Sequence, residues 1–503
     1  MNRLLRLAAL LVAVALCAGG CMLREQEPAD DAFVAALPQP SEEPQELFLG
    51  ENTSARSSSV TLYYAAADGV NFSTVTRSLR VENGESLLDA AVDALLRPSS
   101  DRDAAYFATR DTQLLSTEYA CGTATVNLSI DALSAQSEQE LLALVVSVGN
   151  TLLGIEGVEA VNVLVGGQCV RFSGLPFGAQ AEPVGSIAAA YAQLQTEQEQ
   201  LRAGTSSGVS RWALLYFPTN DGRWLVPERR RISFSGTDFA TGLLEALGKG
   251  PRENDCAIPV LPEGVELLNG APTVSTLSSG EHLLTLNFSS TLTNYLAFSG
   301  LSVWELLGSL SLTCLSFMPE MDAVRVEING TPIEISEDSR FPDGLIRRDD
   351  FSGRIGSVAT LYLACDDGML TPVRRAVSKR SALSARSLLA ELFRYADSEE
   401  SPRFPVPEPM YEDDVLGVQI TGHIARVDLS ANFYRACQNL SEQDERSAVY
   451  AMVNTLCALR DVRAVRFFVE GVAAETLSGN IYLRSPLLPN PGIVADRAGN
   501  PEG

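Results

Sequence analysis

The sequence has few of the residues that usually carry out catalysis or hold a metal. Histidine, the commonest general base in enzymes, occurs only twice, at His282 and His423. None of the 9 cysteines belongs to a Cys-x-x-Cys pair, and their spacing matches no zinc site. Phosphate-binding loops, dinucleotide-binding glycine motifs and calcium-binding loops are also absent from the sequence. We therefore expect a protein that is not an enzyme and that uses neither a cofactor nor a metal.

Basic residues are also scarce. The chain of 503 residues has 38 lysines and arginines against 63 aspartates and glutamates, which gives a formal net charge of −25. Such a surface repels phosphate backbones, and it also repels anionic lipids. The composition argues against nucleic acid as a partner and predicts that stable attachment to a membrane is covalent.

The apolar run near the N-terminus is too short to be a good membrane span. Residues 7–16 (LAALLVAVAL) follow Arg3 and Arg6, whereas a span needs about 20 apolar residues. Small residues lead from this run to Cys21, a pattern that resembles a bacterial lipoprotein signal in which the cysteine carries the lipid. We expect the chain to be lipid-anchored through Cys21 on the extracytoplasmic face of the cell membrane. An ordinary cleaved signal or an uncleaved anchor is the alternative.

The cysteines after Cys17 and Cys21 are odd in number, so a complete set of internal disulfides is impossible. We expect most of them to be buried thiols, with room for one bridged pair that the sequence does not identify. They are Cys121, Cys169, Cys256, Cys314, Cys365, Cys437 and Cys457.

One pattern of strands and helices occurs three times along the chain. Each copy opens with a strand-like run that contains Leu-Tyr and ends in Asp-Gly, which is a hairpin turn signal. These runs are VTLYYAAADG (60–69), ALLYFPTNDG (213–222) and ATLYLACDDG (359–368). Because the pattern recurs at a similar spacing, we expect three copies of one folding unit.

Each copy continues with a helix, a second hairpin, a second helix and a final strand. First helices are expected at 86–98, 239–251 and 385–396, outgoing strands at 124–129, 283–289 and 424–430, and second helices with final strands at 141–167, 305–330 and 447–471. The final strands alternate apolar and polar residues, which predicts a sheet with one buried face. The predicted fold class is α+β: three tandem two-layer α/β sandwiches, each β-β-α-β-β-α-β, with both helices on one face of a mixed or antiparallel sheet.

Changes of composition between the copies predict the domain boundaries. The segment before the first copy is rich in Pro, Glu, Asp and Ser, which indicates a solvated tether, and the first linker contains a polar helix. The expected order is signal peptide 1–21, tether 22–58, domain 1 at 59–174, linker 175–210, domain 2 at 211–332, linker 333–353, domain 3 at 354–476 and an extended tail at 477–503.

Several polar residues recur at matched places, and we interpret them as structural. Aspartates form the Asp-Gly turns, serines cap helices, histidines flank a hairpin, and tyrosines pack in strands with their hydroxyls near the rim. The sets are Asp68, Asp221 and Asp367; Ser129, Ser289 and Ser430; His282 and His423; and Tyr63, Tyr216 and Tyr362. A further matched set near the end of the outgoing strand is Asn127, Asn287 and Asp428.

Arginines follow the Asp-Gly turn in every copy. In an acidic chain, a repeated basic strand edge is a candidate site for an acidic partner or a wall polymer. The alternative is a charged edge that prevents strand-to-strand aggregation. The residues are Arg77, Arg80, Arg229, Arg230, Arg231, Arg374 and Arg375.

These elements together resemble the GerM-type (GerMN) domain, named for a bacterial sporulation and germination protein. The resemblance is carried by the Leu-Tyr strand with its Asp-Gly turn, the Leu-Leu helix, and the Asn-Thr-Leu helix before a Val-rich strand that ends in Gly. The second copy also has LPEGVELL (261–268), close to the family's Pro-Glu-Gly segment, whereas DTQLL (111–115) and FPVPEPMYEDDVL (404–416) depart from it. The resemblance implies a fold similar to ring-building motifs and a lipoprotein that helps to assemble a transenvelope complex.

We therefore expect a non-enzymatic envelope protein with an assembly or scaffold role in sporulation or spore germination. Its expected partners are the membrane, through the N-terminal lipid, and components of an envelope protein complex. The alternative is a lipoprotein that binds or senses peptidoglycan or a small ligand in grooves between the copies.

Overall fold

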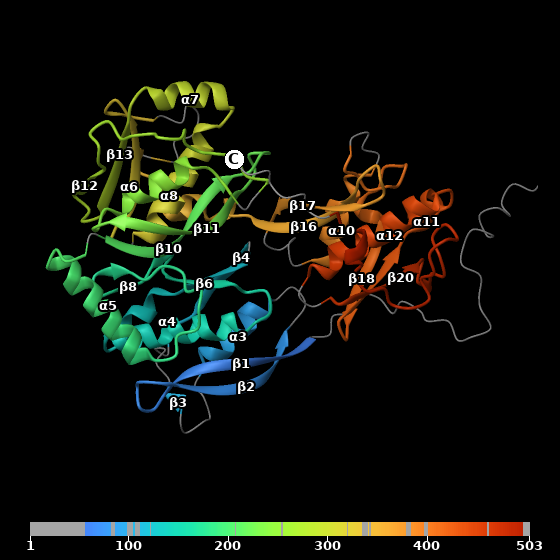
Figure 1. Cartoon of the computed structure of the whole chain (residues 1–503), viewed down its shortest axis with the longest axis horizontal. Helices are drawn as coiled ribbons and strands as arrows, with labels where there is room; N and C mark the ends of the chain where they lie inside the picture. The colour runs from blue at the N-terminus through green and yellow to red at the C-terminus, as the bar shows by residue number, and fades with distance from the viewer. Residues whose placement is uncertain are drawn as a thin grey trace, which may run out of the picture.

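The computed structural model describes residues 56–495 except for short segments, namely 82–85, 98–103, 106–110, 121, 207, 253–254, 319, 334–340, 342–343, 379–383, 397–400 and 460–461. The expected signal peptide, Cys21, most of the expected tether and Cys121 lie outside the described residues. Three units of similar layout, repeats 1 to 3, follow one another from the blue end to the red end of Figure 1. The fold class is the predicted one, with helices and small mixed sheets repeated three times.

Each repeat contains the predicted elements in the predicted order, with short additions. Repeat 1 comprises β1 (Arg56–Ala66), β2 (Phe72–Val81), α3 (Leu87–Leu95), β3 (Ala104–Ala105), β4 (Leu114–Ala120), β5 (Thr123–Leu128), η1 (Ile130–Ser134), α4 (Glu138–Leu153), β6 (Ala160–Val165), β7 (Gln168–Cys169), β8 (Arg171–Phe172) and β9 (Leu175–Pro176). After α5 (Ile187–Arg202), repeat 2 comprises β10 (Gly208–Pro218), β11 (Leu225–Ser235), α6 (Phe239–Gly248), β12 (Thr273–Thr276), β13 (His282–Phe288), α7 (Thr291–Ser299), α8 (Val303–Phe317), β14 (Ala323–Ile328) and β15 (Thr331–Pro332). After η3 (Arg348–Arg354), repeat 3 comprises β16 (Ser357–Ala364), β17 (Leu370–Val377), α10 (Ala385–Phe393), η4 (Glu412–Asp414), β18 (Val415–Thr421), β19 (Ile424–Leu429), α11 (Ala431–Cys437), α12 (Glu442–Cys457), β20 (Ala464–Val469), β21 (Val472–Ala473) and η5 (Pro491–Ile493).

The strands of repeats 2 and 3 divide between two sheets, and repeat 1 has in addition a third, two-stranded sheet of β8 and β9. The first hairpin stands apart, and the later strands form a four-stranded sheet in the order β4-β5-β6-β7, β12-β13-β14-β15 or β18-β19-β20-β21. The two central strands of each four-stranded sheet run parallel, and the outer pairings are antiparallel. The long helix of each repeat, α4, α8 or α12, contacts both the first strand of the hairpin and the third strand of the sheet. This helix therefore joins the two sheets into one unit.

The helices begin where the sequence supplies a cap. Ser302 accepts a hydrogen bond from the backbone N–H of Glu305, and the Glu305 carboxylate accepts one from the backbone N–H of Ser302, which makes a capping box at the start of α8. Ser86 and Asp89 form the same arrangement at the start of α3. Each repeat is built around one large core cluster, and the cluster of repeat 2 also includes Leu175 of repeat 1 and Ala376 of repeat 3.

The final strands of repeats 1 and 3 correct the prediction of one buried face, because all residues of β6 and β20 are buried. The exceptions to the alternation, Leu164 and Phe468, lie on the face that was expected to be polar. In repeat 3, the guanidinium of Arg466 on that same face donates to the carbonyl oxygen of Leu483, so the tail covers it.

The chain after each repeat pairs with the final strand of that repeat. A valine in the second place of the strand exchanges two backbone hydrogen bonds of 2.8–2.9 Å with a later residue in each case. The pairs are Val161 with Gln180, Val324 with Ile346, and Val465 with Leu487. Segments expected as linkers and as an extended tail therefore add an antiparallel bridge to the domain that precedes them.

None of the helices in the described part of the chain is, by itself, long and apolar enough to cross a bilayer. The pair α7 and α8 meets the requirement together by length and composition, but the two helices bend by 117° at their junction. Most of α8 is buried in the core of repeat 2.

The three repeats meet where β4, β11 and β16 contact one another, near the centre of Figure 1. The hydroxyl of Ser357, in β16, donates a hydrogen bond to the carbonyl oxygen of Tyr119, in β4. Leu225, the first residue of β11, forms a parallel bridge with Ile355 just before β16. One strand of each repeat thus contributes to a common junction.

Candidate interaction surfaces

One arginine holds the same register in the first hairpin of every repeat and lies over an aromatic ring. The guanidinium carbon is 5.7–6.0 Å from the ring centroid in the three cases, a distance at which a cation is attracted to the ring. The pairs are Arg77 with Tyr64, Arg230 with Phe217, and Arg375 with Tyr395, and the residues opposite the arginines are Val60, Ala213 and Ala359.

Arg230 is buried, and its charge is used inside repeat 2. Its guanidinium pairs with Glu228 and donates hydrogen bonds to the carbonyl oxygens of Ala246, at 2.7 Å, and Gly250, at 2.9 Å. A buried charge is costly unless it is paired and hydrogen-bonded, and a cation is favoured at the C-terminal end of a helix. Arg230 therefore ties the hairpin to the end of α6.

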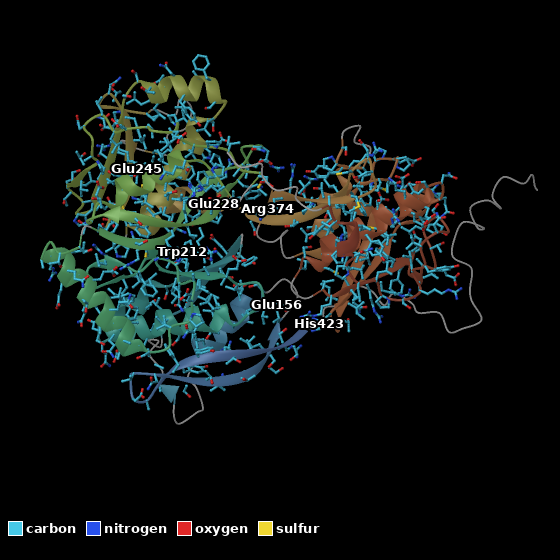
Figure 2. All side chains as sticks on the ribbon, viewed as in Figure 1. Glu156, Trp212, Glu228, Glu245, Arg374 and His423 are labelled. Atoms are coloured by element: carbon cyan, nitrogen blue, oxygen red, sulfur yellow. The ribbon has the colours of Figure 1, made fainter. Side chains whose placement is uncertain are left out.

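Arg229 binds across the boundary between repeats 1 and 2. It forms an ion pair with Glu159 of repeat 1 at 3.3 Å, and its guanidinium carbon lies 4.9 Å from the ring centroid of Trp212. Figure 2 shows Trp212 in the region where repeat 2 faces repeat 1. The backbone agrees, because Ala179, in the connecting segment, donates a 2.9 Å hydrogen bond to the carbonyl oxygen of Trp212.

A second ion pair joins repeats 1 and 3. Arg463 and Glu156 approach to 3.0 Å, and both side chains are largely exposed. Figure 2 shows Glu156 beside His423, whose carbonyl oxygen accepts a 2.8 Å hydrogen bond from the backbone N–H of Arg463. Exposed pairs contribute little to stability, so this contact adds little to the attachment of repeat 3 to repeat 1.

The remaining predicted arginines differ in exposure. Arg80 and Arg231 are exposed, whereas Arg77, Arg374 and Arg375 are half-buried. The predicted set is distributed over the first hairpins of the three repeats. Binding of an acidic partner or wall polymer by these arginines stays a prediction.

Three matched threonines satisfy donors on the edge of the first hairpin. The backbone N–H of the matched tyrosine donates a 3.0 Å hydrogen bond to a threonine Oγ1 of the long helix in every repeat. The pairs are Tyr63 with Thr151, Tyr216 with Thr313, and Tyr362 with Thr455. Buried backbone donors need a partner, so the threonines hold the helix against the strand.

The matched Asn or Asp closes the turn after the final strand. Its Oδ1 accepts a hydrogen bond of 2.7–3.0 Å from a glycine N–H in each repeat, and that glycine has φ between 79° and 83°. The pairs are Asn127 with Gly167, Asn287 with Gly330, and Asp428 with Gly471. Burial raises the pKa of Asp428, the N–H of Gly471 opposes the shift, and the charge of Glu470 adds to it.

The other matched residues mostly confirm the structural interpretation. The Oδ1 atoms of Asp68, Asp221 and Asp367 accept turn N–H groups at 2.8, 3.2 and 2.9 Å. Ser430 caps α11, but the N-cap of α7 is Ser290 rather than Ser289, and Ser129 begins η1 without a side-chain cap. His282 begins β13 after a hairpin turn, and His423 lies in a turn with φ of 65°.

Tyr216 corrects the prediction that the matched tyrosines hold their hydroxyls near the rim. It is fully buried, because repeat 1 and the second linker approach it. Burial raises its pKa, and the charges of Arg348 in the linker and Glu118 in repeat 1 also act on the hydroxyl.

The described cysteines are free thiols with raised pKa values. All six, Cys169, Cys256, Cys314, Cys365, Cys437 and Cys457, are free, so the pair that the odd count allowed does not form among them. Burial raises the pKa of Cys169 to about 11 and that of Cys314 to about 12. Within the described part of the chain, no group of three or more His, Cys, Asp or Glu side chains could hold a metal ion.

Each repeat also exposes a leucine at a matched backbone position, and the sequence analysis missed this feature. In repeat 1, Leu114 pairs with Leu128 and Ser116 pairs with Asn127, which leaves Leu115 as an extra residue in a β-bulge. Leu115 is 54% exposed. A bulge re-aims the extra side chain, and here the chain turns an apolar one toward solvent.

The same position in the other repeats is occupied by Leu268 and Leu416, which are 47% and 41% exposed. Leu416 is the extra residue at the bulge of β18, and Leu268 directly follows the bridge between Leu267 and Phe288. The available sequence signal was an adjacent apolar pair, Leu-Leu or Val-Leu, in all three segments. Periodicity alone assigns both members of such a pair to the core.

The family follows from a comparison with known sequences. The sequence profile of the Germane family, described as sporulation and spore germination, matches residues 61–171, 214–334 and 360–475. The chain belongs to the Germane family. Each match falls on one repeat, so the chain carries three tandem GerMN domains, as the resemblance implied.

Several solved structures align with parts of this chain. The tandem GerMN domains of the sporulation protein GerM from Bacillus subtilis share 19% identity over 58% of this chain and 97% of that chain, with a TM-score of 0.22. A putative lipoprotein from Clostridium perfringens shares 24% identity over 27% of this chain and 92% of that chain, with a TM-score of 0.18. The first GerMN domain of the same GerM shares 20% identity over 27% and 92%, with a TM-score of 0.19. No curated protein matches the chain.

Proposed function

We infer that this Germane protein is a lipid-anchored envelope component that assembles a protein complex in sporulation or spore germination and catalyses no reaction. The supporting observation is what the three repeats share. Their matched residues bond to the backbone, as Thr313 does at a strand edge and Asn287 does at the last turn. The repeats thus keep a common shape, and a shape presented three times suits multivalent contact with partner proteins.

The proposed anchor is a lipid on Cys21, which would concentrate the three domains at the membrane surface. We expect Cys21→Ala to move the protein from the membrane fraction to the soluble fraction. A chain that stays in the membrane fraction after this change is held there by something other than the lipid.

Assembly is tested by crosslinking the full chain in cells that are sporulating or germinating. We expect membrane-complex proteins to be recovered with it. Recovery of no partner, together with retention of the chain on purified peptidoglycan, would favour the wall-binding alternative. Retention that is lost in Arg80→Ala/Arg231→Ala, the two exposed members of the arginine set, would assign that binding to the hairpins.

A further inference from the structure

We propose that Leu115, Leu268 and Leu416 are three copies of one docking site, and that each accepts an apolar side chain of a partner segment flanked by lysine or arginine. This inference rests on the proposed assembly function and specifies the chemistry of the partner.

A single exposed leucine is ordinary on a protein surface and would need no explanation. Here the exposed leucine recurs at one structural position. The residue before it is buried or half-buried in each repeat and pairs with the strand that leads to the second helical segment. The three segments differ in sequence around this position, and each exposes the same side chain to solvent. Core packing cannot be the common reason, because the adjacent residue supplies the core contact in each repeat.

In repeat 1, further exposed apolar side chains accompany the leucine. In repeat 1, Gln113 and Ser129 bond to each other, with Ser129 N–H donating at 2.8 Å and its Oγ accepting at 3.1 Å, which brings η1 beside the bulge. The exposed side chains of Ile130 and Leu133 belong to η1. In repeat 3, Ser430 N–H donates at 2.9 Å to the carbonyl oxygen of Asp414, two residues before the leucine.

The carboxylates close to the leucines in the sequence indicate the charge of the partner. Each leucine follows an exposed carboxylate within four residues, namely Asp111 in repeat 1, Glu266 in repeat 2, and Glu412 and Asp413 in repeat 3. The whole chain carries a net charge of −25, so its field attracts cationic segments. A second copy of this chain or an anionic bilayer would bring like charge to the same place, and both are disfavoured as occupants.

The test uses the full chain in neutral phosphatidylcholine nanodiscs, with empty nanodiscs as the blank. The probe is a fluorescein-labelled amphipathic helical peptide with leucines on one face and lysines on the other, and anisotropy reports its binding. The comparison probe has glutamate in place of every lysine. We expect the lysine peptide to bind and the glutamate peptide to fail.

The variant Leu115→Ser/Leu268→Ser/Leu416→Ser should raise the Kd of the lysine peptide by about tenfold or more, because each site loses its apolar contact. The matched control is Leu488→Ser, an exposed leucine of the tail, which should change the Kd by less than about twofold. The variant Asp111→Asn/Glu266→Gln/Asp413→Asn keeps the leucines and should weaken binding and reduce its dependence on salt. This carboxylate variant tests the proposal if the serine variant fails to fold.

Equal binding by the serine variant and the natural chain would overturn the proposal, and so would equal binding of the two peptides. Leucine-dependent binding to phosphatidylglycerol vesicles would also overturn it, since the occupant would then be lipid. Failure here is separable from failure of the assembly function. Partners that still crosslink to the serine variant would leave assembly intact and remove these sites from it.

Discussion

Thr313 accepts a 3.0 Å hydrogen bond from the backbone N–H of Tyr216, so a buried helix completes the hydrogen bonding of a strand edge. Ser309, one helical turn earlier, donates to the carbonyl oxygen of the same Tyr216. The two helix hydroxyls therefore replace the neighbouring strand that β10 lacks on this side. A hairpin that stands apart from the four-stranded sheet is held to its repeat in this way.

The variant Thr313→Val keeps the shape of the side chain and removes its acceptor. We expect the free energy of unfolding of repeat 2 to fall by about 1–3 kcal/mol, because the N–H of Tyr216 stays buried without a partner. Denaturant unfolding measures the loss. Thr293→Val, at an exposed position in α7, is the control and should stay within about 0.5 kcal/mol of the natural chain. Equal losses in the two variants would contradict the role of the bond.

Neighbouring arginines of one predicted cluster should differ in their effect on stability. Arg230→Ala leaves the carboxylate of Glu228 buried without its cation and frees two carbonyl oxygens at the end of α6, so we expect a loss of about 3–5 kcal/mol. Arg231→Ala removes an exposed side chain and should cost less than about 0.5 kcal/mol. Thermal unfolding of both variants checks the contrast. If Arg230→Ala proves as stable as Arg231→Ala, the buried network does not hold the hairpin to α6.

The order of elements could be predicted from the sequence because each element has its own hydrophobic periodicity and its own boundary residues. The segment 239–251 was expected to be helical, and α6 spans Phe239–Gly248. The division into two sheets could not be predicted in this way. An apolar alternation shows that a strand has a buried face, but β13 finds its parallel partner β14 only after two intervening helices.

The residues of the candidate surfaces were harder to predict from the sequence, for a related reason. Arg230 and Arg231 are adjacent in the sequence, and only the register of β11 determines that Arg230 faces Glu228 and Arg231 faces solvent. Leu267 and Leu268 both match the pattern of core residues, and the sequence does not show that the bridge to Phe288 is made by Leu267. In both cases, the contact that determines which side chain is exposed is made by a residue or a backbone group that the local sequence pattern does not specify.

Asp428 should make repeat 3 less stable as the pH rises. Its raised pKa means that the folded chain holds the proton more tightly than the unfolded chain, whose aspartate has a pKa of about 3.9. The stability that this site contributes is therefore fully present below the pKa of the unfolded chain. It falls as the pH rises from that pKa to the pKa of the folded chain, and it stays lower at higher pH.

The variant Asp428→Asn should remove this loss, because Asn127 and Asn287 hold the same turn with a neutral side chain. We expect the variant to be more stable than the natural chain at neutral pH, with a gain that shrinks as the pH falls toward the unfolded value of about 4. Chemical unfolding at both pH values measures the difference. The reciprocal change Asn127→Asp should destabilise repeat 1 at neutral pH. A variant that is less stable than the natural chain at neutral pH would show that the ionised carboxylate is favoured in the turn.

Glu445 should control how firmly the tail stays on repeat 3. Its carboxylate is fully buried and accepts hydrogen bonds from the backbone N–H groups of Leu477, Ser478 and Asn480 at 2.9, 2.7 and 2.8 Å. Glu445→Ala leaves these donors without an acceptor, so the tail should open more often. We expect hydrogen exchange at the three amides to accelerate by about tenfold or more.

Glu442→Ala is the matched control, because Glu442 is an exposed carboxylate in the first turn of the same helix. Its effect on exchange in the tail should be small. The amides of β20 should also change less than those of the tail, since the core of repeat 3 packs on that strand. Unchanged exchange at Leu477 in Glu445→Ala would mean that apolar burial of the tail and its bridge to Val465 suffice to hold it, and that the carboxylate serves only the start of α12.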